Sequence, residues 1–61
     1  MKVKIKSFNG ELPSYLTVGK IYEVVMGGFP YVDIVDDEGD CINVNIERSG
    51  HLNGGSWEVV E

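Results

Sequence analysis

LTVGKIYEVV, residues Leu16 to Val25, is the segment that decides how the rest of the chain can fold. It begins as an extended apolar run, breaks at Gly19 and resumes as a β-rich segment from Ile21 to Met26. Glycine has no Cβ, so the backbone can turn sharply here and the next strand can start in a new direction. Because apolar residues lie on both faces of the segment after Gly19, we predict a central, strongly curved strand that is covered on both sides.

Outside this segment, four short stretches alternate apolar and polar residues in the way that is typical of half-buried strands. They cover residues 1–7, 31–35, 41–46 and 57–60. The residues that we expect to face the core, including those of the central strand, are Val3, Ile5, Tyr22, Val24, Met26, Val32, Ile34, Ile42, Val44, Ile46, Trp57 and Val59. Apolar residues nowhere keep the helical spacing of i, i+3, i+4 and i+7 over about ten residues, so we predict no α-helix.

The connections between these strands carry turn signals. Residues 8–15 form an irregular loop, residues 27–30 follow the central strand, and residues 36–40 (DDEGD) form a tight turn whose glycine can take a positive φ angle. Residues 49–55 are polar and glycine-rich, which predicts a flexible loop with a single 3₁₀ turn near its start. Five short strands spaced about ten residues apart predict one all-β domain, residues 1–61, built as a small five-stranded antiparallel barrel.

The length and the single cysteine limit what can stabilise this domain. A chain of 61 residues buries only about 60% of the surface that its unfolded form exposes, so its stability is marginal. Cys41 is the only cysteine, which excludes an internal disulfide, and no Cys and His cluster could hold structural zinc. The domain must rely on its core or on association. One unpaired thiol and no apolar run of about 20 residues predict a cytoplasmic protein without a signal peptide or membrane contact.

The formal net charge of −5 argues against general nucleic-acid binding, for which a basic face is expected. Lys2, Lys4 and Lys6 recur at period two and therefore share one face of the first strand. Acidic residues crowd the hairpin around the tight turn, and we call them the acidic hairpin: Asp33, Asp36, Asp37, Glu38 and Asp40. It is either a solvated turn or a negative surface for a basic partner, and the sequence leaves both open.

No set of residues points to catalysis. His51 is the only side chain that could act as a base near neutral pH, and Cys41 faces outward by the parity of its strand, so no catalytic pair is predicted. The acidic hairpin does not match the EF-hand spacing, and no phosphate-binding glycine motif occurs. We therefore predict a protein that is not an enzyme and that binds no metal and no cofactor.

The aromatic residues fall into two groups. Tyr22 and Trp57 are expected in the core. The others lie in or beside loops that would meet at one end or flank of such a barrel, and with the one histidine they form a candidate interaction patch: Phe8, Tyr15, Phe29, Tyr31 and His51. The alternative is scattered exposure of single aromatic side chains, which is ordinary in a domain of this size.

The order of these parts resembles the Src homology 3 (SH3)-like barrel over nearly the whole chain. The resemblance is carried by residues 16–24 (LTVGKIYEV), by residues 34–39 as a hairpin and by residues 57–60 (WEVV). It implies a small barrel, and the signalling members of that family bind PxxP peptides on aromatic ridges. Here Phe29 or Tyr31 stands where those members have a tryptophan, so the resemblance implies the fold rather than recognition of proline-rich peptides.

The lysine-rich first strand, the segment Leu-Thr-Val-Gly-Lys-x-Tyr-Glu-Val and the closing Trp-Glu-Val are also similar to small uncharacterised bacteriophage proteins. We expect a non-catalytic protein-interaction module that binds an unidentified protein, as a phage product would act on a host protein. Two alternatives stay open: an acidic mimic of nucleic acid that inhibits a DNA-binding protein, and a small barrel that binds nucleic acid through Lys2, Lys4 and Lys6. A free sheet edge on so short a core also allows weak self-association.

Overall fold

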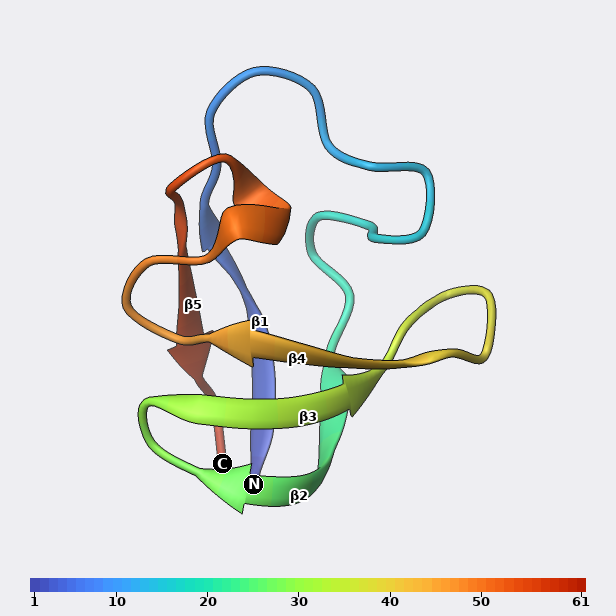
Figure 1. The fold of residues 1–61 in the computed structure, drawn as a ribbon, viewed down its shortest axis with the longest axis vertical. Helices are drawn as coiled ribbons and strands as arrows, with labels where there is room; N and C mark the ends of the chain where they lie inside the picture. The colour runs from blue at the N-terminus through green and yellow to red at the C-terminus, as the bar shows by residue number, and fades with distance from the viewer.

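The computed structural model describes residues 1–61 and shows an all-β domain (Figure 1). Its elements are β1 (Lys2–Ser7), β2 (Tyr22–Gly28), β3 (Tyr31–Val35), β4 (Cys41–Asn45), the 3₁₀ turn η1 (Gly50–Leu52) and β5 (Ser56–Val59). Neighbouring strands are antiparallel, and their order across the sheet is β4-β3-β2-β1-β5. The predictions of an all-β fold, of five antiparallel strands and of no α-helix are confirmed. No helix has the length and apolar character needed to cross a membrane.

The sheet folds over on itself without closing into a continuous barrel. Its two edges are β4 and β5, which are linked where the Trp57 N–H donates a 2.8 Å hydrogen bond to the Ile46 carbonyl, just after β4. In Figure 1, β3 and β4 cross β1 and β5 at a steep angle, and β2 curves from one pair to the other. The predicted barrel is therefore right in class, but the sheet stays open.

A β-bulge interrupts β2. Val24 pairs with Ile34, whereas Met26 pairs with Asp33, so Val25 is an extra residue on this strand. Side chains of a regular strand alternate between the two faces, and one extra residue reverses that alternation. For this reason Met26, which we predicted to share the core face, is 70% exposed.

The prediction that β2 is covered on both faces is wrong. Ile21, just before the strand, and Val25 within it are each 54% exposed, because the sheet folds around one core and nothing covers its outer face here. Gly27 of β2 lies close to the backbone of β3. It has a φ of 90°, and a Cβ at this position would lie 2.7 Å from the Tyr31 carbonyl oxygen. Only glycine fits such a position.

Ten buried apolar side chains form the core between the two halves of the sheet. The period-two alternation predicts all of them except Leu16 and Leu52. Tyr22 and Trp57, both expected in the core, contact each other edge to face with ring centroids 5.8 Å apart, an arrangement that aromatic pairs favour. The eight core residues that the alternation predicts correctly come from β1, β2, β3 and β5 and from β4 with the residue that follows it. Val24 and Ile42, also predicted in the core, are only partly buried and pack against it.

Besides Met26, three more residues differ from their predicted place in or outside the core. Leu16 lies in the connection from β1 to β2, residues 8–21, which we call the first loop, and Leu52 lies in η1. No periodic pattern marks the residues that point inward in these two segments. Val59 was expected in the core but is 47% exposed. Although it pairs with the buried Val3, β4 approaches β5 near Trp57, so the end of β5 lacks a covering layer.

The segment from Ser49 to Gly55 is not the flexible polar loop that its composition predicts. Ser49 and Leu52 are fully buried, and Leu52 fills the core beneath η1. The Ser49 N–H donates to the Gly55 carbonyl over 2.7 Å, and the Gly55 N–H donates to the Leu52 carbonyl over 3.1 Å. A Cβ on Gly55 would clash with the Ser7 carbonyl oxygen, so this segment lies directly against the end of β1. The single 3₁₀ turn is confirmed, one residue later than predicted.

Replacing Leu52 by alanine tests whether η1 is part of the core. Because Leu52 is fully buried, Leu52→Ala is expected to lower the free energy of unfolding by about 2–5 kcal/mol. A domain of this length has roughly 3–9 kcal/mol in total, so the variant should be largely unfolded or close to it. Urea unfolding followed by Trp57 fluorescence measures the loss. Val59→Ala, at a half-exposed position, is the control, and an equal loss in both variants would contradict the packing described here.

Candidate functional site

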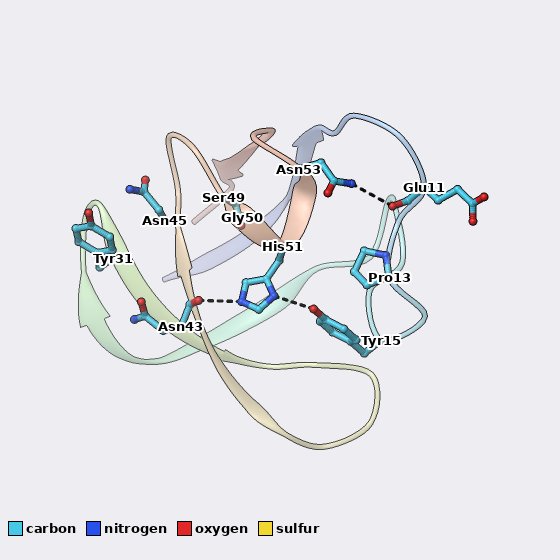
Figure 2. A pocket seen from close by; sticks show the side chains of 10 residues that line it. All are labelled: Glu11, Pro13, Tyr15, Tyr31, Asn43, Asn45, Ser49, Gly50, His51 and Asn53. Atoms are coloured by element: carbon cyan, nitrogen blue, oxygen red, sulfur yellow. Dashed lines mark hydrogen bonds between the residues drawn. The ribbon is translucent and has the colours of Figure 1, made fainter.

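A pocket of about 570 Å³ lies between the first loop, β4 and the η1 turn (Figure 2). It is the only pocket in the structure. Most of the side chains around it are polar or aromatic. They are Glu11, Pro13, Tyr15, Tyr31, Asn43, Asn45, Ser49, Gly50, His51 and Asn53.

The first half of the first loop is tied to the η1 turn by an exchange of amide hydrogen bonds. The Asn9 side-chain amide donates to the Asn53 carbonyl over 3.1 Å, and the Asn53 amide donates in return to the Asn9 carbonyl over 2.7 Å. The Asn9 N–H also donates to the Leu52 carbonyl over 3.1 Å. Asn53 adopts a left-handed conformation with a φ of 55°, which asparagine tolerates better than most residues. These contacts hold Glu11 and Pro13 at one wall of the pocket.

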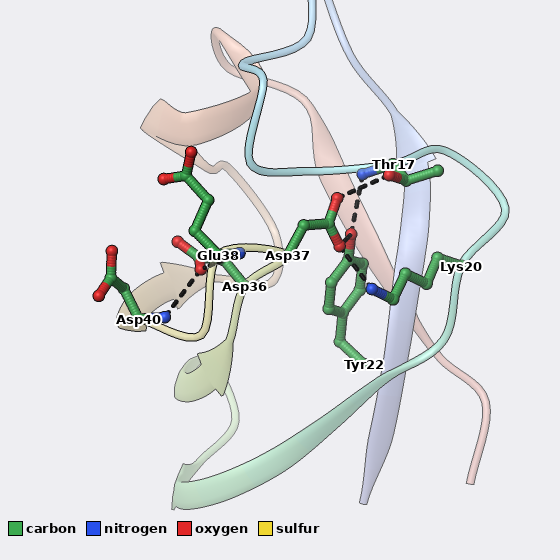
Figure 3. Close-up of polar contacts among 7 residues, drawn as sticks. All are labelled: Thr17, Lys20, Tyr22, Asp36, Asp37, Glu38 and Asp40. Atoms are coloured by element: carbon green, nitrogen blue, oxygen red, sulfur yellow. Dashed lines mark hydrogen bonds and ion pairs between the residues drawn. The ribbon is translucent and has the colours of Figure 1, made fainter.

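The second half of the loop is held by Asp37 from the β3–β4 turn (Figure 3). Thr17 Oγ1 donates to Asp37 Oδ2 over 2.6 Å, and Lys20 Nζ and the Tyr22 hydroxyl donate to Oδ1 over 2.6 and 2.9 Å. The Asp37 N–H in turn donates to the Tyr15 carbonyl over 2.9 Å. A single aspartate therefore connects the turn to four residues in the loop and at the start of β2.

This network shifts the acidities of three of its members. The pKa of Asp37 falls from 3.8 to about 2, chiefly because Lys20 and then Thr17 donate hydrogen bonds to its carboxylate. The same contact with Asp37 raises the pKa of the Lys20 ammonium above its usual 10.5. Burial raises the pKa of Tyr22 above 10.0. At neutral pH the group is thus a carboxylate, an ammonium and an un-ionised phenol.

The acidic hairpin does not present five free carboxylates. Asp36 is buried, and its Oδ1 accepts the backbone N–H groups of Glu38 and Asp40 over 2.9 Å each. Asp37 is bonded to the first loop, and Asp33 accepts a 2.9 Å hydrogen bond from the Asn43 amide. Figure 3 shows the Glu38 and Asp40 side chains extending away from the turn. Carboxylate oxygens of Asp36, Glu38 and Asp40 lie within 4.8 Å of one another, a grouping that by itself defines no metal site.

The candidate interaction patch is divided in the structure. Tyr15, Tyr31 and His51 line the pocket, whereas Phe8 and Phe29 are exposed outside it. The Tyr15 hydroxyl lies 2.8 Å from His51 Nδ1, and His51 Nε2 lies 3.2 Å from the Asn43 carbonyl oxygen. Both ring nitrogens of the histidine are therefore engaged, and its ring meets that of Tyr15 edge to face at 5.8 Å.

The thiol of Cys41 forms no hydrogen bond with His51. Cys41 is a free, exposed cysteine at the start of β4, as the parity of the strand predicts. The partners of His51 are Tyr15 and Asn43, and neither ring nitrogen bonds the sulfur. Cys41 and His51 therefore do not form the thiol and base pair that covalent catalysis uses.

The side chains that sequence reasoning missed are the amides around the pocket. Asn45 Oδ1 accepts the backbone N–H groups of Glu47 and Arg48 over 2.9 and 3.1 Å, which leaves its NH₂ group for the pocket. Asn43 and Asn45 alternate with buried residues of β4, and that parity was the available signal. Nothing in the local sequence, however, indicates that the first loop returns to cover this strand.

Two of the three lysines of β1 lie beside glutamates. Lys2 pairs across the sheet with Glu23, and Lys4 pairs with Glu58. The Lys2 ammonium also forms a 3.2 Å ion pair with Glu61. Carboxylates are therefore interleaved with the lysine stripe.

Comparison of the chain with protein-family models, with curated proteins and with solved structures found no match. The function of the site is therefore inferred from its own geometry.

The Asp37 network makes a prediction about acid stability. The pKa of the Asp37 carboxyl group is about 2 in the folded protein and near 3.8 in the unfolded chain. Its contribution to the free energy of unfolding is therefore complete above about pH 4 and is lost as the pH falls toward 2. Asp37→Asn is therefore expected to be less stable than wild type at neutral pH, and the difference between the two proteins should shrink below about pH 4. Thermal unfolding at a series of pH values measures it.

The matched control for this experiment is Glu38→Gln, one residue away, since the Glu38 carboxylate accepts no hydrogen bond. A loss of stability at neutral pH should occur in Asp37→Asn but not in the control. If the two variants unfold alike at every pH, Asp37 does not hold the loop as the structure shows.

Proposed function

We propose that the protein is a non-catalytic interaction module that binds a segment of another protein in the pocket between the first loop, β4 and η1. The observation that carries this proposal is the composition of the pocket wall. It combines two tyrosine rings with the amides of Asn43, Asn45 and Asn53. Tyrosine supplies large contact area with little loss of conformational entropy, and asparagine supplies adaptable hydrogen bonds, which is why both are common in protein-binding surfaces.

The size of the pocket and the side chains at its wall suit a segment of a protein. Its volume of about 570 Å³ is in the range of sites that enclose small groups, so it accepts a few side chains rather than a whole domain. The Tyr31 ring is 57% exposed and forms no hydrogen bond, which leaves it available to a partner. Tyr15 and His51, in contrast, are already held by each other, so this wall is formed before a partner arrives.

The charge of the site favours a cationic partner segment. Glu11 is the only carboxylate that lines the pocket, and no lysine or arginine lines it. The free carboxylates of Glu38 and Asp40 and the net charge of −5 add a negative field around it. Such a field speeds the encounter with basic partners and is weakened by salt.

The two alternative functions have less support. An acidic mimic of nucleic acid needs free carboxylates, but three members of the acidic hairpin are used inside the molecule. Direct binding of nucleic acid needs a continuous basic surface, but the lysines of β1 are interleaved with glutamates. The pocket is the feature that neither alternative uses.

The proposal is tested with short peptides and amide chemical-shift mapping. Lysine- or arginine-rich peptides are expected to shift the amides around the pocket, in residues 11–15 and 43–53, and a neutral peptide of equal length should shift them much less. Raising the salt concentration from about 0.05 to 0.5 M should weaken the binding, because it screens exposed charges.

Two exposed aromatic side chains provide a matched pair for this experiment. Tyr31→Ser removes a ring that lines the pocket and should weaken binding by about tenfold or more, the loss typical of a central aromatic contact. Phe29→Ser removes a ring that is 61% exposed but lies outside the pocket, and it should leave the affinity unchanged. Shifts that map to another face, or an affinity that depends on Phe29 and not on Tyr31, would overturn the proposed site.

A further inference from the structure

Tyr15, His51 and Asn43 form a chain of hydrogen bonds at the pocket, and the chemistry of its last member fixes its direction (Figure 2). His51 Nε2 lies 3.2 Å from the Asn43 carbonyl oxygen, which can only accept. Nε2 must therefore carry a hydrogen. In the un-ionised imidazole the other nitrogen, Nδ1, then has none and accepts, so the Tyr15 hydroxyl donates to it over 2.8 Å.

In this state the Tyr15 hydroxyl can accept a hydrogen bond from a ligand but cannot donate one to it. Its one hydrogen points at His51, and the lone pairs of its oxygen remain for the pocket. When His51 gains a proton, Nδ1 also becomes a donor, and the Tyr15 oxygen must accept from it. The hydroxyl hydrogen then has to turn away from His51. Tyr15 thereby changes from an acceptor into a donor, while its oxygen and the imidazole nitrogens keep their positions.

We propose that the protonation state of His51 sets the hydrogen-bonding polarity of the pocket. With His51 un-ionised, Tyr15 is an acceptor and the pocket suits a donor-rich, cationic group. With His51 protonated, Tyr15 is a donor, the pocket gains a positive charge, and such a group is disfavoured on both counts. The direction of these hydrogen bonds does not depend on the proposed function, and only their effect on binding rests on that function.

The surroundings of His51 leave few other groups that could produce the same effect. The other titratable residues lining the pocket are Glu11 and Tyr15 from the first loop and Tyr31 from β3. β4 contributes Asn43 and Asn45, which carry no charge. One further charged side chain comes close through these amides, because Asp33 accepts a hydrogen bond from the Asn43 side chain. Asn45 accepts only the backbone N–H groups of Glu47 and Arg48, whose side chains are exposed.

The backbone around this chain of hydrogen bonds is fixed from both sides. Tyr15 is held through its carbonyl, which accepts the Asp37 N–H, and His51 belongs to η1, whose Leu52 is fully buried in the core. Neither ring has to move for the proton to rearrange. Protonation of His51 therefore changes whether Tyr15 donates or accepts a hydrogen bond in the pocket, and it does not open the pocket.

Nuclear magnetic resonance on the wild-type protein tests the direction of the chain without any ligand. Between about pH 8 and pH 5, where histidine changes charge, the ¹⁵N shifts of His51 report which nitrogen carries the hydrogen. We expect hydrogen on Nε2 and none on Nδ1 at the alkaline end. The Tyr15 Cζ shift should move with the same midpoint as His51, and that of Tyr31, in the same pocket without this bond, should stay constant. Hydrogen on Nδ1 at the alkaline end, or a Tyr15 shift that ignores His51, overturns the proposal.

A tri-arginine peptide then measures the effect on binding. In the wild-type protein its affinity should fall by about tenfold or more as His51 becomes protonated, because an unmatched donor is added to the repulsion of like charges. In Tyr15→Phe, which keeps the charge change and lacks the hydroxyl, the fall should be clearly smaller. Equal falls in both proteins overturn the reversal at Tyr15. Absence of binding at every pH overturns the proposed function instead, while the shift titration still decides the direction of the chain.

Discussion

The Asp37 carboxylate joins the two parts of the molecule that form the pocket. It accepts hydrogen bonds from Thr17, Lys20 and Tyr22, while its own N–H donates to the Tyr15 carbonyl. Ordering the long first loop costs conformational entropy. Burial of Leu16 offsets part of this cost, and the polar contacts with the opposite hairpin fix the position of the pocket wall that Tyr15 forms.

The sequence predicts those parts of the fold in which neighbouring residues alternate between core and solvent. Val3 and Ile5 in β1 and Val32 and Ile34 in β3 are buried as their spacing indicates. Prediction failed where the alternation was broken or absent. The bulge at Val25 reverses the parity of β2, and the inward direction of residues in the first loop and η1 is set by contacts with distant strands.

The site could be predicted only in part for the same reason. Aromatic side chains beside loops are visible in the sequence, and three members of that patch, Tyr15, Tyr31 and His51, line the pocket. The bond between His51 and the Asn43 carbonyl could not be foreseen, because it joins η1 to the backbone of a strand eight residues earlier. The charges of the acidic hairpin were likewise visible, whereas their internal partners, such as Thr17, become apparent only when the first loop is in place.

Native-state hydrogen exchange at the Asp37 amide tests most directly whether the first loop is held as described. This N–H lies outside every strand, and its only partner is the Tyr15 carbonyl. We predict slow exchange, close to that of the Ile46 amide, which donates to the Pro30 carbonyl beside the buried core. Exchange of the Asp37 amide as fast as in an unstructured peptide would show that the loop is free, and it would contradict a pocket that is formed before a partner binds.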